Sequence, residues 1–269
     1  MTYATIVVDA SPAPSVRQTL EAAKAFAEAF GATLDVVSCA WPDTSLLAQA
    51  LGSGNVASAQ WQTQVMEEAL QTTRHLGEQV MQGSQLQSTW CSSVAEPVRV
   101  LCDHLFTADL AITGPGDRGP FCSADPTNLA LRSGAPVLRL GREPSDTQFE
   151  HVLIAWKDCR EARRAVHDAL PILQAAKSVW VVGVGDEVTT DRLGALSQHL
   201  ARHKVAAQPL HLARSEDGVC AQILRQAKTE GCGLIVSGAY SRNRHSERIL
   251  GGVTRDLHAD DQMSWYFAH

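Results

Sequence analysis

The sequence predicts an α/β protein made of two tandem, doubly wound domains, each with a five-stranded parallel sheet. Short segments rich in β-branched residues alternate with longer segments of helical period. The strand segments are apolar throughout, which is typical of parallel sheets covered on both faces. The whole pattern also occurs twice in 269 residues. Because a polar, proline-containing stretch at 142–150 separates the copies, the predicted domains are residues 1–141 and 151–269.

Each copy opens with a strand and a helix. Residues 3–9 and 151–157 form the first strands, which end on the polar residues Asp9 and Lys157. Helical periodicity follows at about 15–30 and 160–175. The next apolar segments, 33–39 and 178–184, predict the second strands. Matching the first strands by their polar ends pairs Asp9 with Lys157.

The copies differ between the second and third strands. The first has a long insert at about 40–83, most of it a polar helix from about residue 57, whereas the second has a short helix around 190–202. Strand 108–114 then matches 232–238, and the closing strand 135–140 matches 263–268. Ligands in doubly wound folds bind beyond the carboxyl ends of the strands, so we expect the site there.

The composition excludes several classes of protein. A formal net charge of -6, with both signs scattered, argues against nucleic acid as the main partner. The seven cysteines include no C-x-x-C pair, which is typical of reduced thiols. No segment approaches the ~20 apolar residues that span a bilayer, and the N-terminus lacks a basic region. We therefore expect a cytoplasmic protein without a membrane partner.

A glycine-rich segment follows the strand 232–238. Gly238 lies at the strand end, and Gly251 and Gly252 precede the next helical pattern. Backbone N–H groups in such a segment can approach an anion closely. The cationic side chains in or beside it suit phosphate: Arg242, Arg244, His245, Arg248 and Arg255. The pattern predicts phosphates against the backbone N–H groups of Ser241, Gly251, Gly252 and Val253.

The spacing of this segment resembles the G-x2-G-x9-G-[S/T] nucleotide loop of the universal stress proteins. Gly238 and Gly251 occupy the first and third glycine positions, and Ser241 replaces the second glycine. Gly252 stands at the hydroxyl position, with Thr254 two residues later. As a signal of fold this resemblance is stronger than as a signal of ATP binding.

The resemblance covers nearly the whole chain. Residues 155–171 are similar to the first strand and helix of that family. The resemblance implies a Rossmann-like fold of the adenine-nucleotide alpha-hydrolase type, with the two copies packed as a pseudo-dimer through their last strands. A further homodimer and the regulatory protein partner are left open.

The resemblance also implies an adenine-nucleotide site, with ATP, with or without Mg²⁺, bound in the second domain only. In nucleotide-binding members an aspartate at the end of the first strand positions the nucleoside. The second copy has Lys157 and Asp158 there, so either Asp158 replaces that aspartate or Lys157 pairs with a neighbouring carboxylate. The candidate ligand-binding residues are Gly238, Ser241, Gly251, Gly252, Val253, Thr254, Lys157, Asp158 and Val184.

The matching loop of the first copy, which begins at Gly114, is predicted to be degenerate. Its prolines at 115, 120 and 126 remove backbone donors where a phosphate needs them. Asp117 and Asp125 add negative charge that repels phosphate. We expect a structural turn without a ligand.

Other motifs have simpler interpretations. His199 and His203 have a spacing that suits a metal, with His211 as the nearby third candidate, but a solvated helix end is favoured. Cys159 begins a helix, whose dipole is expected to lower the pKa of the thiol, although an inert cysteine is favoured. Three tryptophans in or beside strands predict core or interface packing: Trp156, Trp180 and Trp265.

No serine-nucleophile, Walker or metalloprotease motif is present, so no catalytic residue is predicted. The expected function is that of a stress-response, ATP-binding protein that regulates partners or its own stability without efficient catalysis. One alternative is a scaffold that binds no nucleotide. The other is a slow ATPase in which Lys157, Arg242 and Arg255 stabilise the transferring phosphate.

Overall fold

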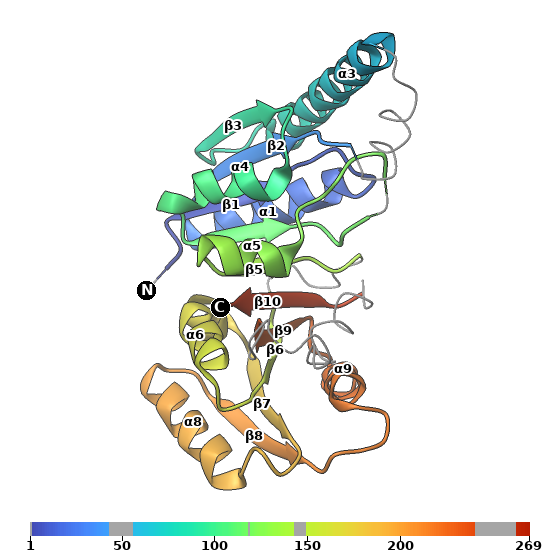
Figure 1. The fold of residues 1–269 in the computed structure, drawn as a ribbon. Helices are drawn as coiled ribbons and strands as arrows, with labels where there is room; N and C mark the ends of the chain where they lie inside the picture. The colour runs from blue at the N-terminus through green and yellow to red at the C-terminus, as the bar shows by residue number, and fades with distance from the viewer. Residues whose placement is uncertain (1, 43–55, 118, 143–148, 240–261) are drawn as a thin grey trace. The chain divides into compact units, whose positions relative to one another are not determined.

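The computed structural model describes residues 2–42, 56–117, 119–142, 149–239 and 262–269. The chain forms two compact units, Tyr3–Ala135 and a second that extends from Pro136 to His269. Each is an α/β unit built around a mostly parallel sheet (Figure 1). In the part of the chain that the structure describes, none of the helices has the length and apolar character that a membrane crossing requires.

The sheet of the first unit has the strand order β3-β2-β1-β4, with all pairs parallel. These strands are β1 (Thr5–Asp9), β2 (Thr33–Cys39), β3 (Ser88–Ser93) and β4 (Leu110–Thr113). Ile6, Leu34 and Ile112 are fully buried in its core. Continuous burial along β4 explains why its sequence is apolar at nearly every position rather than at every second one.

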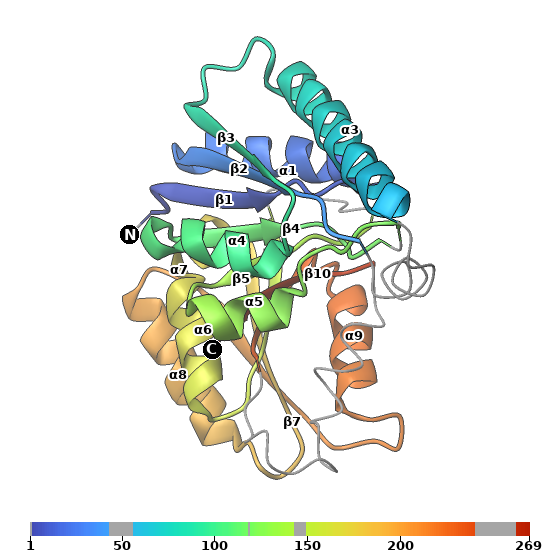
Figure 2. The same ribbon diagram turned by 45° about the horizontal axis from the view of Figure 1, so that its top comes forward.

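Helices cover both faces of this sheet, with α1 and α3 on one face and α4 and α5 on the other (Figure 2). Tyr3 packs its ring against Phe26 and Phe30 of α1, which anchors this helix at its C-terminal end. The polar helix predicted from about residue 57 is confirmed as α3. The bounds are α1 (Val16–Phe30), α3 (Val56–Met81), α4 (Pro97–His104), a 3₁₀ turn (Leu105–Thr107) and α5 (Pro126–Ser133).

The second unit has the strand order β5-β10-β9-β6-β7-β8. Its strands are β5 (Val137–Arg139), β6 (His151–Ala155), β7 (Ser178–Val184), β8 (Ala207–Leu212), β9 (Leu234–Gly238) and β10 (Ser264–Ala268). Helices α6 and α8 cover one face and α9 the other (Figure 1). The helices are α6 (Arg160–Asp168), α7 (Leu170–Ala175), α8 (Thr190–Arg202) and α9 (Val219–Thr229).

One predicted helix of the second unit is divided. The sequence predicts a continuous helix at 160–175, but α6 ends at Asp168 and α7 begins at Leu170. Pro171 lies in the first turn of α7. A proline lacks the backbone N–H that a continuing helix would use, whereas this donor is not needed at a helix start.

The last strands of the two repeats pair with each other. Strand β5 runs antiparallel to β10, with Leu138 opposite Tyr266 at the centre of the pairing. This pairing agrees with the packing through last strands that the family resemblance implies. Because β5 lies in the second compact unit, that unit begins at Pro136, whereas the predicted domain limit at residue 141 follows the sequence repeat.

Candidate functional site

Strand pairing fixes which residues of the two repeats correspond. Thr5 pairs with the first residue of β2, and His151 pairs with the first residue of β7, so Thr5 corresponds to His151. The other neighbours agree, because the N–H of Asp109 donates to Thr5 and that of Gly233 donates to His151. Counting along the strands, Asp9 corresponds to Ala155.

This correspondence corrects the predicted pairing of Asp9 with Lys157. Lys157 corresponds to Ser11, two positions beyond the strand. The polar ends of the two strands are not equivalent, because β6 ends at Ala155 and the chain continues through Trp156 before it becomes polar. The second repeat therefore has alanine at the position where the first repeat has its strand-end aspartate.

In the first repeat, Asp9 is held by its own chain. Its Oδ1 accepts hydrogen bonds from the backbone N–H of Ser11 at 3.0 Å and from Ser11 Oγ at 2.6 Å. Its Oδ2 accepts from the N–H of Ala124, in the loop after β4, at 3.2 Å. Burial raises the pKa of the Asp9 carboxyl, and the hydrogen bonds from Ser11 and Ala124 lower it in part.

We expect Asp9→Asn to remove a pH-dependent contribution to the stability of the first unit. The folded state raises the pKa of Asp9 and therefore binds this proton more tightly than the unfolded chain does. The contribution is fully present below the unfolded-state pKa, near 3.8, and is lost as pH rises through the folded-state pKa. Urea unfolding of wild type and variant over a range of pH values measures it. A free-energy difference that stays constant with pH would contradict this expectation.

The loop after β4 brings carboxylates to the positions that an anion would occupy. Asp117 Oδ2 accepts from the backbone N–H of Ser15, at the start of α1, at 2.8 Å. Asp125 caps α5 by accepting from the N–H of Asn128 at 2.6 Å, and Pro126 follows it in the first turn. The cavity left at this strand end has a volume of only about 20 Å³, room for about one water molecule. This arrangement supports the predicted structural role of the loop.

In the second repeat, Gly238 lies where the end of β9 meets α6. A Cβ at this position would lie 2.6 Å from the backbone nitrogen of Ala162 and 2.6 Å from the carbonyl carbon of Glu161. Gly114 has the equivalent place in the first repeat, where a Cβ would lie 2.8 Å from Thr19 Oγ1. Both glycines therefore allow the fourth strand to approach the first helix of its repeat closely.

Two candidate residues lie at the ends of neighbouring strands. Val184 is the last residue of β7 and is partly exposed. Lys157 follows β6, and its Nζ lies 2.7 Å from Glu187 Oε2, with the lysine side chain 45% exposed. This pairing with a neighbouring carboxylate is one of the two alternatives that the sequence left open. An exposed ion pair of this kind is weak and can be opened by a competing anion.

Asp158 does not turn toward the strand end. Its Oδ1 accepts a hydrogen bond from Arg163 Nε at 3.1 Å, and its Oδ2 lies 3.6 Å from Arg192 Nη1. The hydrogen bond from Arg163 is the main cause that lowers the pKa of Asp158, and the charges of both arginines add to it. Sequence spacing gives no signal for these ion pairs, because Asp158 precedes α6, Arg163 lies five residues away and Arg192 belongs to α8.

The remaining candidates of the glycine-rich segment, Ser241, Gly251, Gly252, Val253 and Thr254, lie outside the described residues. The cationic side chains predicted beside them lie in the same segment. The strand-end side of the site is therefore described by Gly238, Lys157 and Val184, whereas Asp158 contacts Arg163 and Arg192 instead.

The expected lowering of the Cys159 pKa is wrong. Burial raises the pKa of this thiol, and the hydrogen bond from the backbone N–H of Ala162 offsets the rise only in part. Burial thus outweighs the hydrogen bond at the helix start, and the inert interpretation of this cysteine is favoured.

His199 and His203 contact each other at the end of α8, with ring centroids 4.8 Å apart. Within the described ranges, no three histidine, cysteine or carboxylate side chains are grouped as metal ligands. Trp265 and Trp156 are buried, at 0% and 9% exposure, and Trp180 is half-buried. These tryptophans pack as predicted.

No protein-family model and no curated protein matches the sequence. Among solved structures, a universal stress protein from Archaeoglobus fulgidus DSM 4304 is similar, with a TM-score of 0.70 and 13% identity over 97% of this chain and 95% of its own. A functionally unknown protein from Pseudomonas aeruginosa PAO1 has a TM-score of 0.60 and 14% identity over 99% and 92%. A protein assigned to the universal stress proteins, from Pseudomonas aeruginosa UCBPP-PA14, has a TM-score of 0.59 and 14% identity over 99% and 93%.

These structures match both repeats together, since each covers nearly the whole chain. At such low identity the likeness shows the fold and leaves the ligand to be argued from the site. The fold that the glycine-rich segment indicated is confirmed: this chain has the tandem α/β fold of the universal stress proteins.

Proposed function

We propose that this protein binds one adenine nucleotide per chain at the strand ends of its second unit, and that binding regulates its stability or its association with a partner. ATP, with or without Mg²⁺, is the proposed ligand, and efficient catalysis is not part of the proposal. The described strand-end residues Gly238, Lys157 and Val184 would form one wall of the site. The glycine-rich segment 240–255 would supply the phosphate-binding N–H groups.

The observation that carries this proposal is the contrast between the two repeats. In the first, Asp117 and Asp125 already accept the N–H groups at the starts of α1 and α5. In the second, Cys159 makes no side-chain hydrogen bond that caps α6, no side-chain oxygen of the described residues is seen to cap it, and the exposed cation Lys157 lies two residues before it. A helix start and a cation favour an anion, whereas internal carboxylates exclude one.

Ligand binding at this site would act through mass action. A ligand that binds only the folded state stabilises it by RT ln(1 + [L]/Kd), or about 2.7 kcal/mol at a hundredfold excess over Kd. A stabilisation of this size raises the ratio of folded to unfolded protein by about a hundredfold. Regulation therefore needs no chemical step.

A scaffold without nucleotide binding is the second candidate, and Ala155 favours it. This residue stands where nucleotide-binding relatives are expected to have an aspartate that positions the nucleoside. The ion pair between Lys157 and Glu187 also satisfies the cation without a ligand.

Isothermal titration of the full chain with ATP and Mg²⁺ tests the proposal, and we expect one site per chain. Ala155→Asp restores an acceptor at the strand end and should tighten binding by about tenfold, because a hydrogen bond to a charged group contributes about 1.5–3 kcal/mol before the costs of desolvation. Asp9→Asn, the matched change in the first repeat, should leave the affinity and the stoichiometry unchanged.

The titration separates the alternatives. Two sites per chain, or loss of binding in Asp9→Asn, would place a ligand in the first repeat and overturn the assignment. Absence of binding in wild type and in Ala155→Asp at millimolar ATP would favour the scaffold. Circular dichroism of each variant serves as the control for folding.

A further inference from the structure

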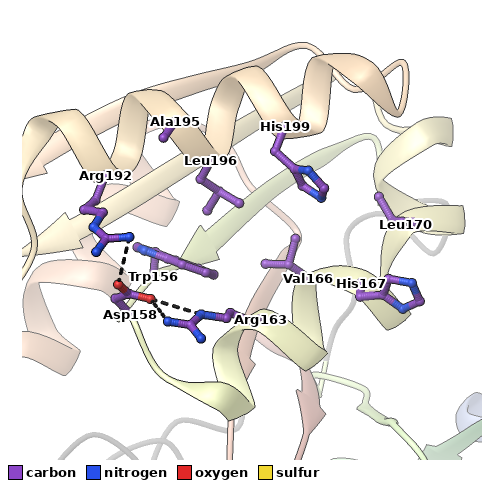
Figure 3. Close-up of a pocket in the computed structure, with 10 residues that line it drawn as sticks. All are labelled: Trp156, Asp158, Arg163, Val166, His167, Leu170, Arg192, Ala195, Leu196 and His199. Carbon is purple, nitrogen blue, oxygen red and sulfur yellow. Dashed lines mark hydrogen bonds and ion pairs between the residues drawn. The ribbon is translucent and has the colours of Figure 1, made fainter.

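A groove lies between α6 and α7 on one side and α8 on the other, in the second unit (Figure 3). Its volume is about 580 Å³, within the range of small-molecule sites. The groove lies between helices that cover one face of the sheet. Of the candidate residues near the strand ends, Asp158 lines it, whereas Gly238, Lys157 and Val184 do not. It is therefore separate from the proposed nucleotide site, and nothing in the proposed function uses it.

The groove has an apolar stretch along its floor and walls, and His167 and His199 also line it. Trp156 forms the floor with 9% of its surface exposed, and Val166 and Leu170 are each 5% exposed. Leu196 contributes from α8 and is half-buried. In Figure 3 these side chains converge on the space between the helices. Such a surface suits the hydrocarbon part of a ligand.

One end of the groove carries a net positive charge. Asp158 lies between Arg163 of α6 and Arg192 of α8, so two guanidinium groups share one carboxylate. Both arginine side chains are well exposed, at 62% and 69%. They can therefore turn toward an incoming anion, and guanidinium geometry suits a carboxylate.

The indole N–H of Trp156 is a hydrogen-bond donor without an acceptor among the described residues. Its Nε1 is buried. Buried indole N–H groups usually find an acceptor, so an orphan of this kind calls for an explanation. The nitrogen edge of the ring faces the Arg192 end of the groove in Figure 3. An oxygen bound at that end would satisfy this donor once the atoms that now cover Nε1 move aside.

We propose that this groove binds a small organic monocarboxylate with an apolar body. The carboxylate accepts hydrogen bonds from Arg192 and from Trp156 Nε1. The apolar body lies along Val166, Leu170 and Leu196. The unpaired indole donor and the excess of one guanidinium both select an anion with an acceptor oxygen, and the apolar walls select against a highly polar phosphate ester.

Octanoate is the probe, and octylamine and octanol are its matched cationic and neutral controls. In calorimetric titration of the full chain, octanoate should bind at least tenfold more tightly than either control. Ala195→Phe places a ring in the groove from α8 and should weaken octanoate binding at least tenfold. Ala201→Phe, an exposed change on the same helix outside the groove, should leave the affinity unchanged.

Two further variants test the polar contacts. Arg192→Gln should weaken octanoate binding about tenfold, while Arg202→Gln, exposed on the same helix, should not. Trp156→Phe keeps an aromatic floor but removes the N–H donor, and should weaken octanoate more than octanol. Equal affinity for octanoate and octylamine, unchanged binding in Ala195→Phe, or absence of octanoate binding in wild type would each overturn the proposal.

Discussion

Replacing Gly238 with alanine is expected to destabilise the second unit by about 1–3 kcal/mol, or more if the helix cannot shift. The added Cβ would lie 2.6 Å from two backbone atoms of α6, in Glu161 and Ala162. Backbone atoms inside a helix cannot turn aside as a side chain can. Relief therefore requires α6 to move away from β9, which loosens packing at the strand end.

Two matched variants isolate this effect in urea unfolding followed by tryptophan fluorescence. Gly114→Ala meets the Thr19 side chain at 2.8 Å, so rotation of that side chain should make its cost smaller. Gly194→Ala, within α8, meets no atom within 4 Å and should stabilise by up to about 1 kcal/mol through helix propensity. If Gly238→Ala and Gly194→Ala unfold at the same urea concentration, the close approach is not a constraint.

Replacing Trp265 with alanine is expected to cost about 3–5 kcal/mol of the stability of the second unit. Trp265 is fully buried in β10, between β5 and β9, and its ring stacks on Phe267 with centroids 6.1 Å apart. Its removal leaves a large cavity in the middle of the sheet. The loss should appear as a lower midpoint in urea unfolding.

The controls for Trp265 separate ring volume from polarity. Trp265→Phe keeps most of the buried area and removes an indole N–H that lacks an acceptor among the described residues, so its cost should be much smaller. Trp180→Ala, at a half-buried position on β7, should also cost less. A loss in Trp265→Ala no larger than in Trp180→Ala would refute the central role of this ring.

Much of the fold follows from local sequence. The predicted bounds of strands β2 and β7 and of helix α8 are confirmed. Their signals, apolar strand segments and helical periodicity, come from residues close together in the sequence. Pro171 is a sequence signal for the division between α6 and α7. The helical periodicity across 160–175 nevertheless predicted one continuous helix. The match of Gly114 with Gly238 also agrees with the strand pairing, because β4 pairs with β1 in the same register as β9 pairs with β6.

The candidate site was predicted less completely. The sequence indicated the degenerate loop of the first repeat, because prolines and aspartates act on the nearest backbone groups. It misplaced the counterpart of Asp9, because hydrogen bonds between distant strands set that correspondence. It also gave no sign of the groove at Trp156, whose walls come from helices separated by a strand.

The α/β class, the repeat and the asymmetry between the two loops can be predicted from sequence, since each depends on the order of residues along one segment. Folding brings together residues that the sequence does not pair: Ala155 takes the position equivalent to Asp9, Asp158 lies between two arginines, and β5 lies beside β10. The physical reason is that periodicity and turn chemistry act over a few residues. Register, ion pairing and burial depend instead on segments brought together by folding.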